Sequence, residues 1–261
     1  MKNDKAEFRK ETEESPQSNM LTMAAAWKQT AAEYRALYYQ GYNVATARVQ
    51  EACRNRKAGD SPLAVITDLD DTVVLPLRYW GTLIAAQKEF FDDDLWANWL
   101  PKYEMIPAPG APDFLKLCKE SDVAVFYITS RNQGDKTTGY VMEQLKRLEY
   151  PYADETHVTV LIGSSDKEAR QKEIAKTHEI VCFLGDNMND FRRAYYECDV
   201  KKRMARMEED KALFGNRFIL FPNPTDGQWI RAIFGVSEPE ASPENREKFE
   251  KAAKEFIEFM K

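Results

Sequence analysis

The sequence predicts an α/β fold in which helices flank a central parallel sheet, with a small helical cap subdomain beside it. Five short apolar runs predict the sheet, at residues 63–67, 123–129, 158–162, 180–184 and 218–221. They lack the alternation of half-exposed strands, and most are separated by segments long enough for helices, which is typical of strands buried on both faces. Ligands of such sheets bind beyond the carboxyl ends of the strands. The residues that follow each run are therefore the candidates for function.

The segment before the first run is predicted to be helical. Nine of the first twenty residues are charged, so we expect residues 1–20 to be a disordered polar leader. Between residues 23 and 52, apolar side chains recur every three or four positions, which predicts one long helix or a helix pair. We assign residues 21–58 to the cap. Gly, Asp, Ser and Pro between residues 55 and 62 then indicate a boundary before a catalytic core at residues 59–236.

An aromatic-rich segment after the first strand is too long for an ordinary strand-to-helix loop, and we expect a cap insertion at about residues 77–106. Most of its aromatic residues should form a small satellite core. Tyr79 and Trp80 lie closest to the first strand and are the candidates for substrate contact. Apolar residues near helical spacing predict an amphipathic helix in residues 237–261; they are Phe249, Ala252, Ala253, Phe256, Ile257 and Phe259.

Composition excludes several classes of function. Acidic residues number 43 against 37 basic ones, a net charge of −6, and this field repels nucleic acid. Four cysteines without CxxC spacing favour buried free thiols over a disulfide scaffold or a zinc site. No apolar run is long enough to cross a membrane.

The carboxylates of Asp68 and Asp70 stand close together after the first strand, in the sequence Asp68-Leu69-Asp70-Asp71-Thr72. Such a pair repels unless a cation or a proton intervenes, and Mg²⁺ accepts carboxylates together with phosphate oxygens. One carboxylate can then attack phosphorus while the other, when protonated, donates to the departing alkoxide. A solvated acidic turn or a helix N-cap would explain an isolated match equally well.

Three further strand ends carry polar side chains. Thr129, Ser130 and Arg131 offer donors for a phosphate after the second predicted strand, although an N-cap role is the simpler explanation of Ser130 alone. Lys167 lies in the first turn of a helix after the third strand, where a cation is unfavourable without an anionic partner, unless it is simply solvated. Asp186 and Asp190 follow the fourth strand in an Asp/Asn-rich turn. The coincidence of all four strand ends makes the combination specific.

These motifs resemble the class C acid phosphatases, the family of the outer-membrane lipoprotein e phosphatase, within the haloacid dehalogenase (HAD) superfamily. The resemblance covers about residues 27–229; it rests on DLDDTVV, VFYITSR, SSDKEARQKEI, FLGDNMNDF, FGNRFILFPNP and, in the N-terminal helix, AAWKQTAAEYRALYYQGYN. It implies a Rossmann-like HAD core and an aspartyl-phosphate mechanism. Family members often have a Tyr where Asp226 stands, and residues 57–61 also lack an aromatic. An aromatic clamp on a nucleobase is therefore missing at these two places.

The resemblance also implies a role for each site residue. Asp68 would be the nucleophile and a metal ligand, and Asp70 the general acid and base that also gives Mg²⁺ its backbone carbonyl. Asp186 would complete the metal site. Thr129 and Lys167 would bind phosphate, and Asp190 would support these groups from behind. From their position after the second predicted strand, and not from the resemblance, we also expect Ser130 to bind phosphate and Arg131 to support it; family members usually have Asn where Ser130 stands.

The leading hypothesis is a magnesium-dependent acid phosphatase that hydrolyses small phosphomonoesters at low to neutral pH, because Asp70 must enter the cycle protonated. A phosphotransferase using the same site is one alternative, and a non-catalytic ligand-binding surface lipoprotein is another. The resemblance further implies export to the periplasm or outer membrane, with the leader as a tether to an N-terminal lipid that is not in this sequence, and a homodimer.

Overall fold

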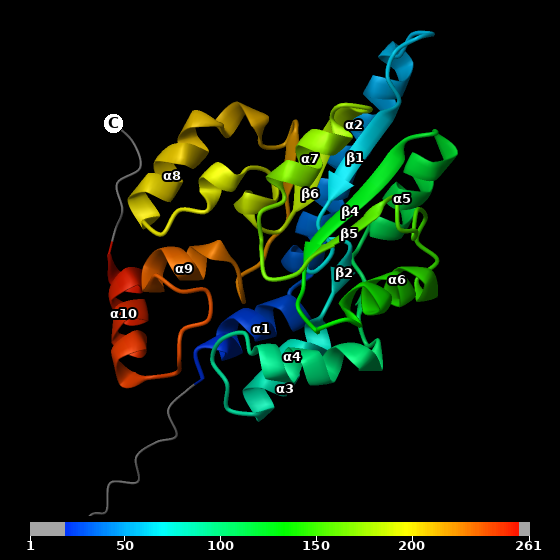
Figure 1. Ribbon diagram of the computed structural model, residues 1–261. Helices are drawn as coiled ribbons and strands as arrows, with labels where there is room; N and C mark the ends of the chain where they lie inside the picture. The colour runs from blue at the N-terminus through cyan, green and yellow to red at the C-terminus, as the bar shows by residue number, and fades with distance from the viewer. Residues whose placement is uncertain (1–18, 256–261) are drawn as a thin grey trace, which may run out of the picture.

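A five-stranded parallel sheet forms the centre of the protein in the computed structural model, which describes residues 19–255 (Figure 1). The strand order is β5-β4-β1-β6-β7. The strands are β1 (Leu63–Thr67), β4 (Ala124–Ser130), β5 (Val158–Leu161), β6 (Glu179–Gly185) and β7 (Phe218–Leu220). The predicted α/β fold class is confirmed, and all five predicted strands are present with ends shifted by at most one residue.

The chain winds outward from β1 in both directions, because β4 and β5 lie on one side of it and β6 and β7 on the other. A change of winding direction opens a crevice at the carboxyl ends of the central strands. The loops after β1, β4, β5 and β6 all leave the sheet at this edge, since every pairing in the sheet is parallel. The topology therefore gathers the polar strand ends of the sequence into one place.

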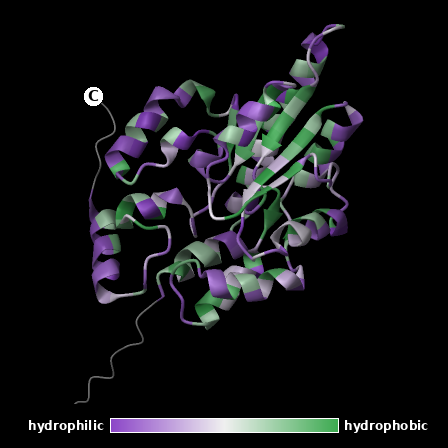
Figure 2. Cartoon of the chain, viewed as in Figure 1, coloured by the Kyte–Doolittle hydropathy of each residue, from purple (hydrophilic) through white to green (hydrophobic). Residues whose placement is uncertain are grey.

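Both faces of the sheet are covered. Alternate residues of β1 enter different clusters: Leu63 and Val65 pack under α2, α5 and α6, while Ala64 and Ile66 pack with Ile174 of α7. This two-sided burial explains why the strands read as continuous apolar runs, which Figure 2 shows as green central strands. The flanking helices are α2 (Ala32–Asn55), α5 (Ala111–Glu120), α6 (Thr137–Arg147) and α7 (Glu168–Ile174).

The N-terminal segment forms a helix pair, α1 (Leu21–Thr30) and α2, which meet at Ala31 in extended backbone geometry. The apolar stripe of α2 is buried through Tyr34, Tyr38 and Tyr42. The ring of Phe221, just after β7, stacks on Tyr38 with centroids 4.9 Å apart. The helix pair is thus packed directly on the catalytic core.

The cap insertion lies between β2 (Val74–Leu75) and β3 (Ile106–Pro107), which pair antiparallel at its base. It contains α3 (Leu77–Ala85), α4 (Asp93–Trp99) and η1 (Leu100–Lys102). Its aromatic side chains pack on one another around Tyr79, whose ring centroid lies 4.8 Å from that of Trp96. Helix α1 contacts α3, so the N-terminal helices and the insertion meet beside the sheet edge.

The C-terminal part adds α8 (Val200–Glu209), α9 (Gln228–Phe234) and α10 (Pro243–Lys254), together with the short helices η2 (Met188–Asp190), η3 (Arg193–Tyr195) and η4 (Lys211–Leu213). Phe249 of α10 packs against Trp229 and Phe234 of α9. The predicted C-terminal helix is thus present between residues 243 and 254. Phe256, Ile257, Phe259 and residues 1–18 of the predicted leader lie outside the described residues.

Two sequence expectations concern the surface and the cysteines. Within residues 19–255, none of the helices has the length and apolarity needed to cross a bilayer. All four cysteines are free; Cys118 and Cys182 are buried as predicted, Cys53 is partly buried, and Cys198 is exposed.

The close packing of α2 on Phe221 gives a stability prediction. A Cβ at Gly41 would lie 2.6 Å from Cε1 of Phe221, whereas one at Gly81 in α3 would meet no atom within 4 Å. Gly→Ala in a helix gains about 1 kcal/mol from propensity, and overpacking costs about 1–3 kcal/mol. Gly81→Ala should therefore stabilise the protein and Gly41→Ala should fall about 1–3 kcal/mol below it in the free energy of unfolding, measured by urea denaturation. Equal effects of the two substitutions would contradict close packing at Gly41.

Candidate active site

Residues from the four strand ends line one cavity of about 420 Å³ at the carboxyl edge of the sheet. Asp68 and Asp70 follow β1, Arg131 follows β4, Lys167 precedes α7, and Asp186 follows β6. The cavity also contacts the cap and the loop between α9 and α10. The structure thus brings together residues that lie more than one hundred positions apart in the chain.

A buried lysine links two carboxylates at the centre of this cavity. The Nζ atom of Lys167 donates to Asp68 and lies 2.8 Å from Oδ1 of Asp190. Although burial opposes it, the charges of Asp190 and Asp68 raise the pKa of Lys167. Asp68 and Asp190 are therefore the anionic partners that the sequence position of Lys167 predicted. Burial raises the pKa of Asp68 to about 7, in spite of Lys167.

Asp190 reaches this position because Gly185 leaves room for it. A Cβ at residue 185 would lie 2.5 Å from Oδ2 of Asp190. Oδ2 accepts a hydrogen bond from the backbone N–H of Asn187, which closes a capping box at the start of η2. The Asp/Asn-rich turn expected from the sequence is therefore present, and it also aims a carboxylate at Lys167.

Asp186 is held by two donors from other loops. The hydroxyl of Thr72 donates to its Oδ1 at 3.2 Å, and the side-chain amide of Asn223 donates to its Oδ2 at 2.8 Å. Burial and the charges of Asp190 and Asp68 raise the pKa of Asp186 well above its usual range. The site concentrates more negative charge than its lysine offsets.

Three of these carboxylates could hold a metal ion. One oxygen from each of Asp68, Asp186 and Asp190 lies within 4.8 Å of the other two. An all-oxygen, anionic set suits a hard divalent cation, which would also relieve the repulsion among buried carboxylates. The residues therefore fit such an ion. Asp190, predicted only to support the ligands, stands among the candidate ligands themselves.

Asp70 points to a different partner. Both of its oxygens accept hydrogen bonds from Arg131, with Nε at 2.8 Å and Nη2 at 2.5 Å. The Nη1 atom of Arg131 is buried and has no partner within the described chain. Arg131 thus fixes the orientation of Asp70, and its Nη1 donor is not used by any residue in the range 19–255.

Thr129 and Ser130 behave differently although they are adjacent. Thr129 is 1% exposed and lines the cavity, and none of its neighbours in residues 19–255 hydrogen-bonds its hydroxyl. The hydroxyl of Ser130 donates to the backbone oxygen of Ser164 at 2.8 Å. Ser130 lines the cavity, and its hydroxyl joins the loops after β4 and β5; donation to phosphate from this hydroxyl stays a prediction.

The two cap residues predicted to contact substrate, Tyr79 and Trp80, also differ in position. Trp80 lines the cavity, as a substrate contact requires. Tyr79 does not: it is fully buried, and its hydroxyl both donates to the backbone oxygen of Asp92 and accepts from the N–H of Asp92. The expectation of a substrate contact is wrong for Tyr79, because that ring is a central member of the cap's own core.

Sequence reasoning missed a buried lysine, Lys28 of α1. Its Nζ lies 2.7 Å from Oδ1 of Asp71 and donates to the hydroxyl of Thr225 at 2.9 Å. It also donates to Oδ1 of Asn223, the residue that holds Asp186. Lys28 falls on the same face of α1 as Leu21 and Ala25, both buried. A lysine at helical spacing on an apolar face was the signal that could have identified it.

Tyrosine hydroxyls hold the backbone of the loop that follows β1. Tyr38 and Tyr42 of α2 donate to the carbonyl oxygens of Asp71 and Thr72, at 2.5 and 2.9 Å. Tyr150 donates to the carbonyl of Val73 at 2.9 Å. Asp71 has a φ of 51°, in the left-handed region that is unusual for a residue with a side chain. These donors satisfy the carbonyls of a strained loop and fix its course.

Comparisons with known proteins agree with this geometry. A family model described as the HAD superfamily, subfamily IIIB (acid phosphatase), matches residues 4–229. Two solved structures of the class C acid phosphatase from Bacillus anthracis, one with tungstate bound, are also similar. Each is 32% identical to this chain and covers 90% of it and 97% of its own length. The TM-scores are 0.81 for the tungstate structure and 0.82 for the other.

The buried pair of Lys28 and Asp71 predicts a strong effect on stability. Lys28→Met leaves the Asp71 carboxylate buried without its cation and should lower the free energy of unfolding by about 3–5 kcal/mol. The double variant with Asp71→Asn should recover part of this loss. Lys116→Met, which removes an exposed pair with Glu120, serves as the control and should cost less than about 1 kcal/mol. Urea denaturation measures all three, and a loss at Lys28 no larger than at Lys116 would contradict the prediction.

Proposed function

The chain belongs to subfamily IIIB of the HAD superfamily, the acid phosphatases, and we propose that it hydrolyses small phosphomonoesters through a phosphorylated Asp68 with the help of Mg²⁺. One observation carries the proposal. The carboxylate of Asp68 lies at the end of β1, in contact with Lys167 and beside Asp186 and Asp190, in a cavity that Asp70 also lines.

The first step is attack by Asp68 on the phosphorus of the ester. A bond forms between its carboxylate oxygen and phosphorus, and the bond from phosphorus to the ester oxygen breaks. Lys167 and the hydroxyl of Thr129 are placed to bind the phosphoryl oxygens. Asp70, when protonated, gives its proton to the departing alkoxide.

The second step releases phosphate. Asp70 now accepts a proton from a water molecule, whose oxygen attacks the phosphorus of the acyl phosphate and restores the Asp68 carboxylate. Each oxygen of Asp70 accepts one hydrogen bond from Arg131 and keeps a second lone pair that can carry the proton. Arg131 therefore sets the direction from which Asp70 reaches the ester oxygen.

A divalent cation, which we propose to be Mg²⁺, would be held by Asp68, Asp186 and Asp190 or a subset of them, together with the backbone carbonyl of Asp70. It would offset the negative charge of the phosphoryl group. Tungstate is a tetrahedral oxyanion, as phosphate is, and its presence in the similar structure supports an oxyanion site in this fold.

The remaining parts of the proposal rest on the family resemblance. We propose that the protein is exported, reaches the periplasm or the outer membrane, and is tethered through its N-terminal leader to a lipid. We also propose a homodimer, and substrates that are small molecules and not nucleic acid.

Substitution of the nucleophile tests the mechanism. Asp68→Asn should lower kcat on aryl phosphates, 5′-nucleotides and sugar phosphates on the order of 10³-fold or more, because an amide cannot form the phosphorylated intermediate. Phosphate release is measured with each ester at several pH values. Asp122→Asn, at an exposed carboxylate, is the control and should leave turnover unchanged. Absence of turnover by the wild type across the panel would favour a binding protein instead.

Removal of metal gives a second prediction. Chelation should abolish phosphate release and Mg²⁺ should restore it. Because the cation would relieve repulsion among buried carboxylates, Mg²⁺ should also raise the Tm of the metal-free protein. Asp186→Asn should reduce that rise, a readout that does not depend on activity. An unchanged Tm with Mg²⁺ would argue against a metal site at this cluster.

A further inference from the structure

The cap and the loops on either side of α9 also line the cavity, and we call the part that they form its second end. Its acidic side chains are Asp93 of α4, Asp226 before α9 and Glu238 after α9. Phe91, Trp80 and Trp96 of the cap line the same cavity. The leaving group of a phosphomonoester bound at Asp68 would lie near this second end, because the charge of Asp70, the proposed proton donor to the leaving group, acts on Asp226.

These three carboxylates have no basic partner. None of Asp93, Asp226 and Glu238 forms an ion pair with any residue in the range 19–255, in contrast to Asp68, Asp70, Asp71 and Asp190, each of which contacts a lysine or an arginine. The hydrogen bonds at Asp226 that involve Asn223 and Trp229 use its backbone. The Asp226 carboxylate does accept a hydrogen bond from the backbone N–H of Gly227, and the charge of Lys28 acts on it, but neither contact is an ion pair.

The carboxylates are also close enough to repel one another. Glu238 is exposed at the cavity wall, and its partial desolvation, followed by the charges of Asp93 and Asp226, raises its pKa to about 7. Burial likewise raises the pKa of Asp226 to about 6, with Asp71 and Asp70 adding to the effect of burial. A positive charge placed among these groups would be stabilised by all of them.

An independent observation concerns Gln228, at the start of α9. Its side chain is 9% exposed and lines the same cavity, and its Oε1 atom accepts no hydrogen bond from any described residue. A buried amide oxygen without a donor is costly, and an N–H of an aminoalkyl group, which a trimethylammonio group lacks, would satisfy it. The lining residues that the cap and the loops around α9 contribute thus present acceptors and include no basic side chain, although the charge of Lys28 acts on Asp226.

The three aromatic rings shape the cavity wall and contribute little to selection of a charged leaving group. The ring of Trp80 already faces Lys28, with Nζ 4.8 Å from the centroid, and that of Trp96 faces Arg131 at 5.6 Å. Two of the three rings therefore already have a protein cation over one face. Selection for charge at this end must come mainly from the carboxylates.

We propose that the enzyme prefers phosphomonoesters whose leaving group carries a positive charge, such as an aminoalkyl or a trimethylammonioalkyl phosphate. This inference rests on the proposed function, since it names the substrate class of the same site. A zwitterionic ester matches both ends of the cavity, with its phosphate at Lys167 and its cation at Asp93, Asp226 and Glu238. An ester with an anionic leaving group would meet unbalanced carboxylates there.

The test uses two esters of the same shape and different charge, phosphocholine and 3,3-dimethylbutyl phosphate. In the wild type with Mg²⁺, at a pH above 7 where Asp226 and Glu238 are ionised, kcat/KM for phosphocholine should exceed that for the neutral ester at least about tenfold, which corresponds to about 1.4 kcal/mol. The ratio should fall toward one in Asp226→Asn and in Glu238→Gln. Glu238 is exposed, so its substitution leaves the fold intact even where Asp226→Asn does not.

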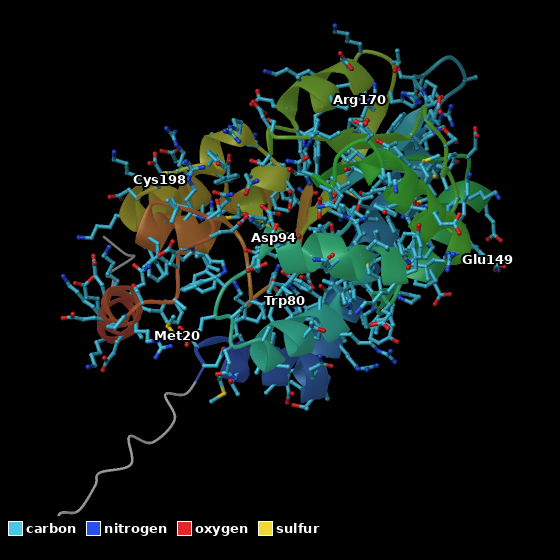
Figure 3. All side chains as sticks on the ribbon, turned by 60° about the horizontal axis from the view of Figure 1, so that its bottom comes forward. Met20, Trp80, Asp94, Glu149, Arg170 and Cys198 are labelled. Carbon is cyan, nitrogen blue, oxygen red and sulfur yellow. The ribbon has the colours of Figure 1, made fainter. Side chains whose placement is uncertain are left out.

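Asp94→Asn is the matched control. Asp94 is the neighbour of Asp93 on α4, is exposed, and does not line the cavity; Figure 3 labels it together with Trp80 of the cavity wall. Its substitution should leave the ratio unchanged. A general loss of surface charge would lower the ratio in this variant as well, which would overturn the assignment to the cavity wall.

Binding to the Asp68→Asn protein separates this inference from the proposed function. The affinity of both esters is measured by calorimetry in the absence of turnover, and phosphocholine should again bind at least about tenfold more tightly. A ratio near one, or a ratio that Asp226→Asn and Glu238→Gln both leave unchanged, would overturn the inference even if the protein is a phosphatase. A preserved ratio with no hydrolysis of any ester would overturn the proposed function alone.

Discussion

Crowding of negative charge at the carboxyl ends of β1 and β6 is the constraint on which the rest of the site depends. Asp68, Asp71 and Asp190 are all nine-tenths buried, and Asp186 lies partly buried among them. Carboxylates do not remain ionised in such a place without cations close by. Lys28 and Lys167 offset part of this negative charge, and a divalent ion bound by the cluster of carboxylate oxygens would offset more of it. The fold must therefore deliver each lysine to the sheet edge from a separate segment.

Lys167 and Lys28 come from different segments of the chain and contact different carboxylates of the cluster. Lys167 comes from the core itself, at the start of α7, and contacts Asp68, the proposed nucleophile. Lys28 comes from α1, outside the core, and reaches Asp186 only through Asn223. Tyr38 and Tyr42 of α2 hold the same loop through its carbonyls. The N-terminal helices are consequently part of the active site's support, which explains why a long helical segment precedes the first strand.

The sequence was most informative where burial and chemistry coincide along the chain. Strands buried on both faces appear as apolar runs, and carboxylates that follow them directly stand at the site, so the sheet and Asp68, Asp70 and Asp186 could be predicted. The strands β2 and β3 were missed because two residues each leave no pattern. Lys28 was missed because its partner, Asp71, lies 43 positions away, and only packing shows that the two meet. Tyr79 was misjudged because sequence proximity to the site does not reveal where a side chain points.

The charges of the cavity divide it into two unlike ends. At the phosphate end, Lys167 and Arg131 stand among the catalytic carboxylates, and each of those basic groups already holds a carboxylate in position. At the other end, carboxylates stand without basic partners on a wall shared by the cap and the loops on either side of α9. Field lines from unpaired charges in a confined, partly buried space are poorly screened by water. The part of a substrate that is released, and not only its phosphate, therefore contributes to which esters the site accepts.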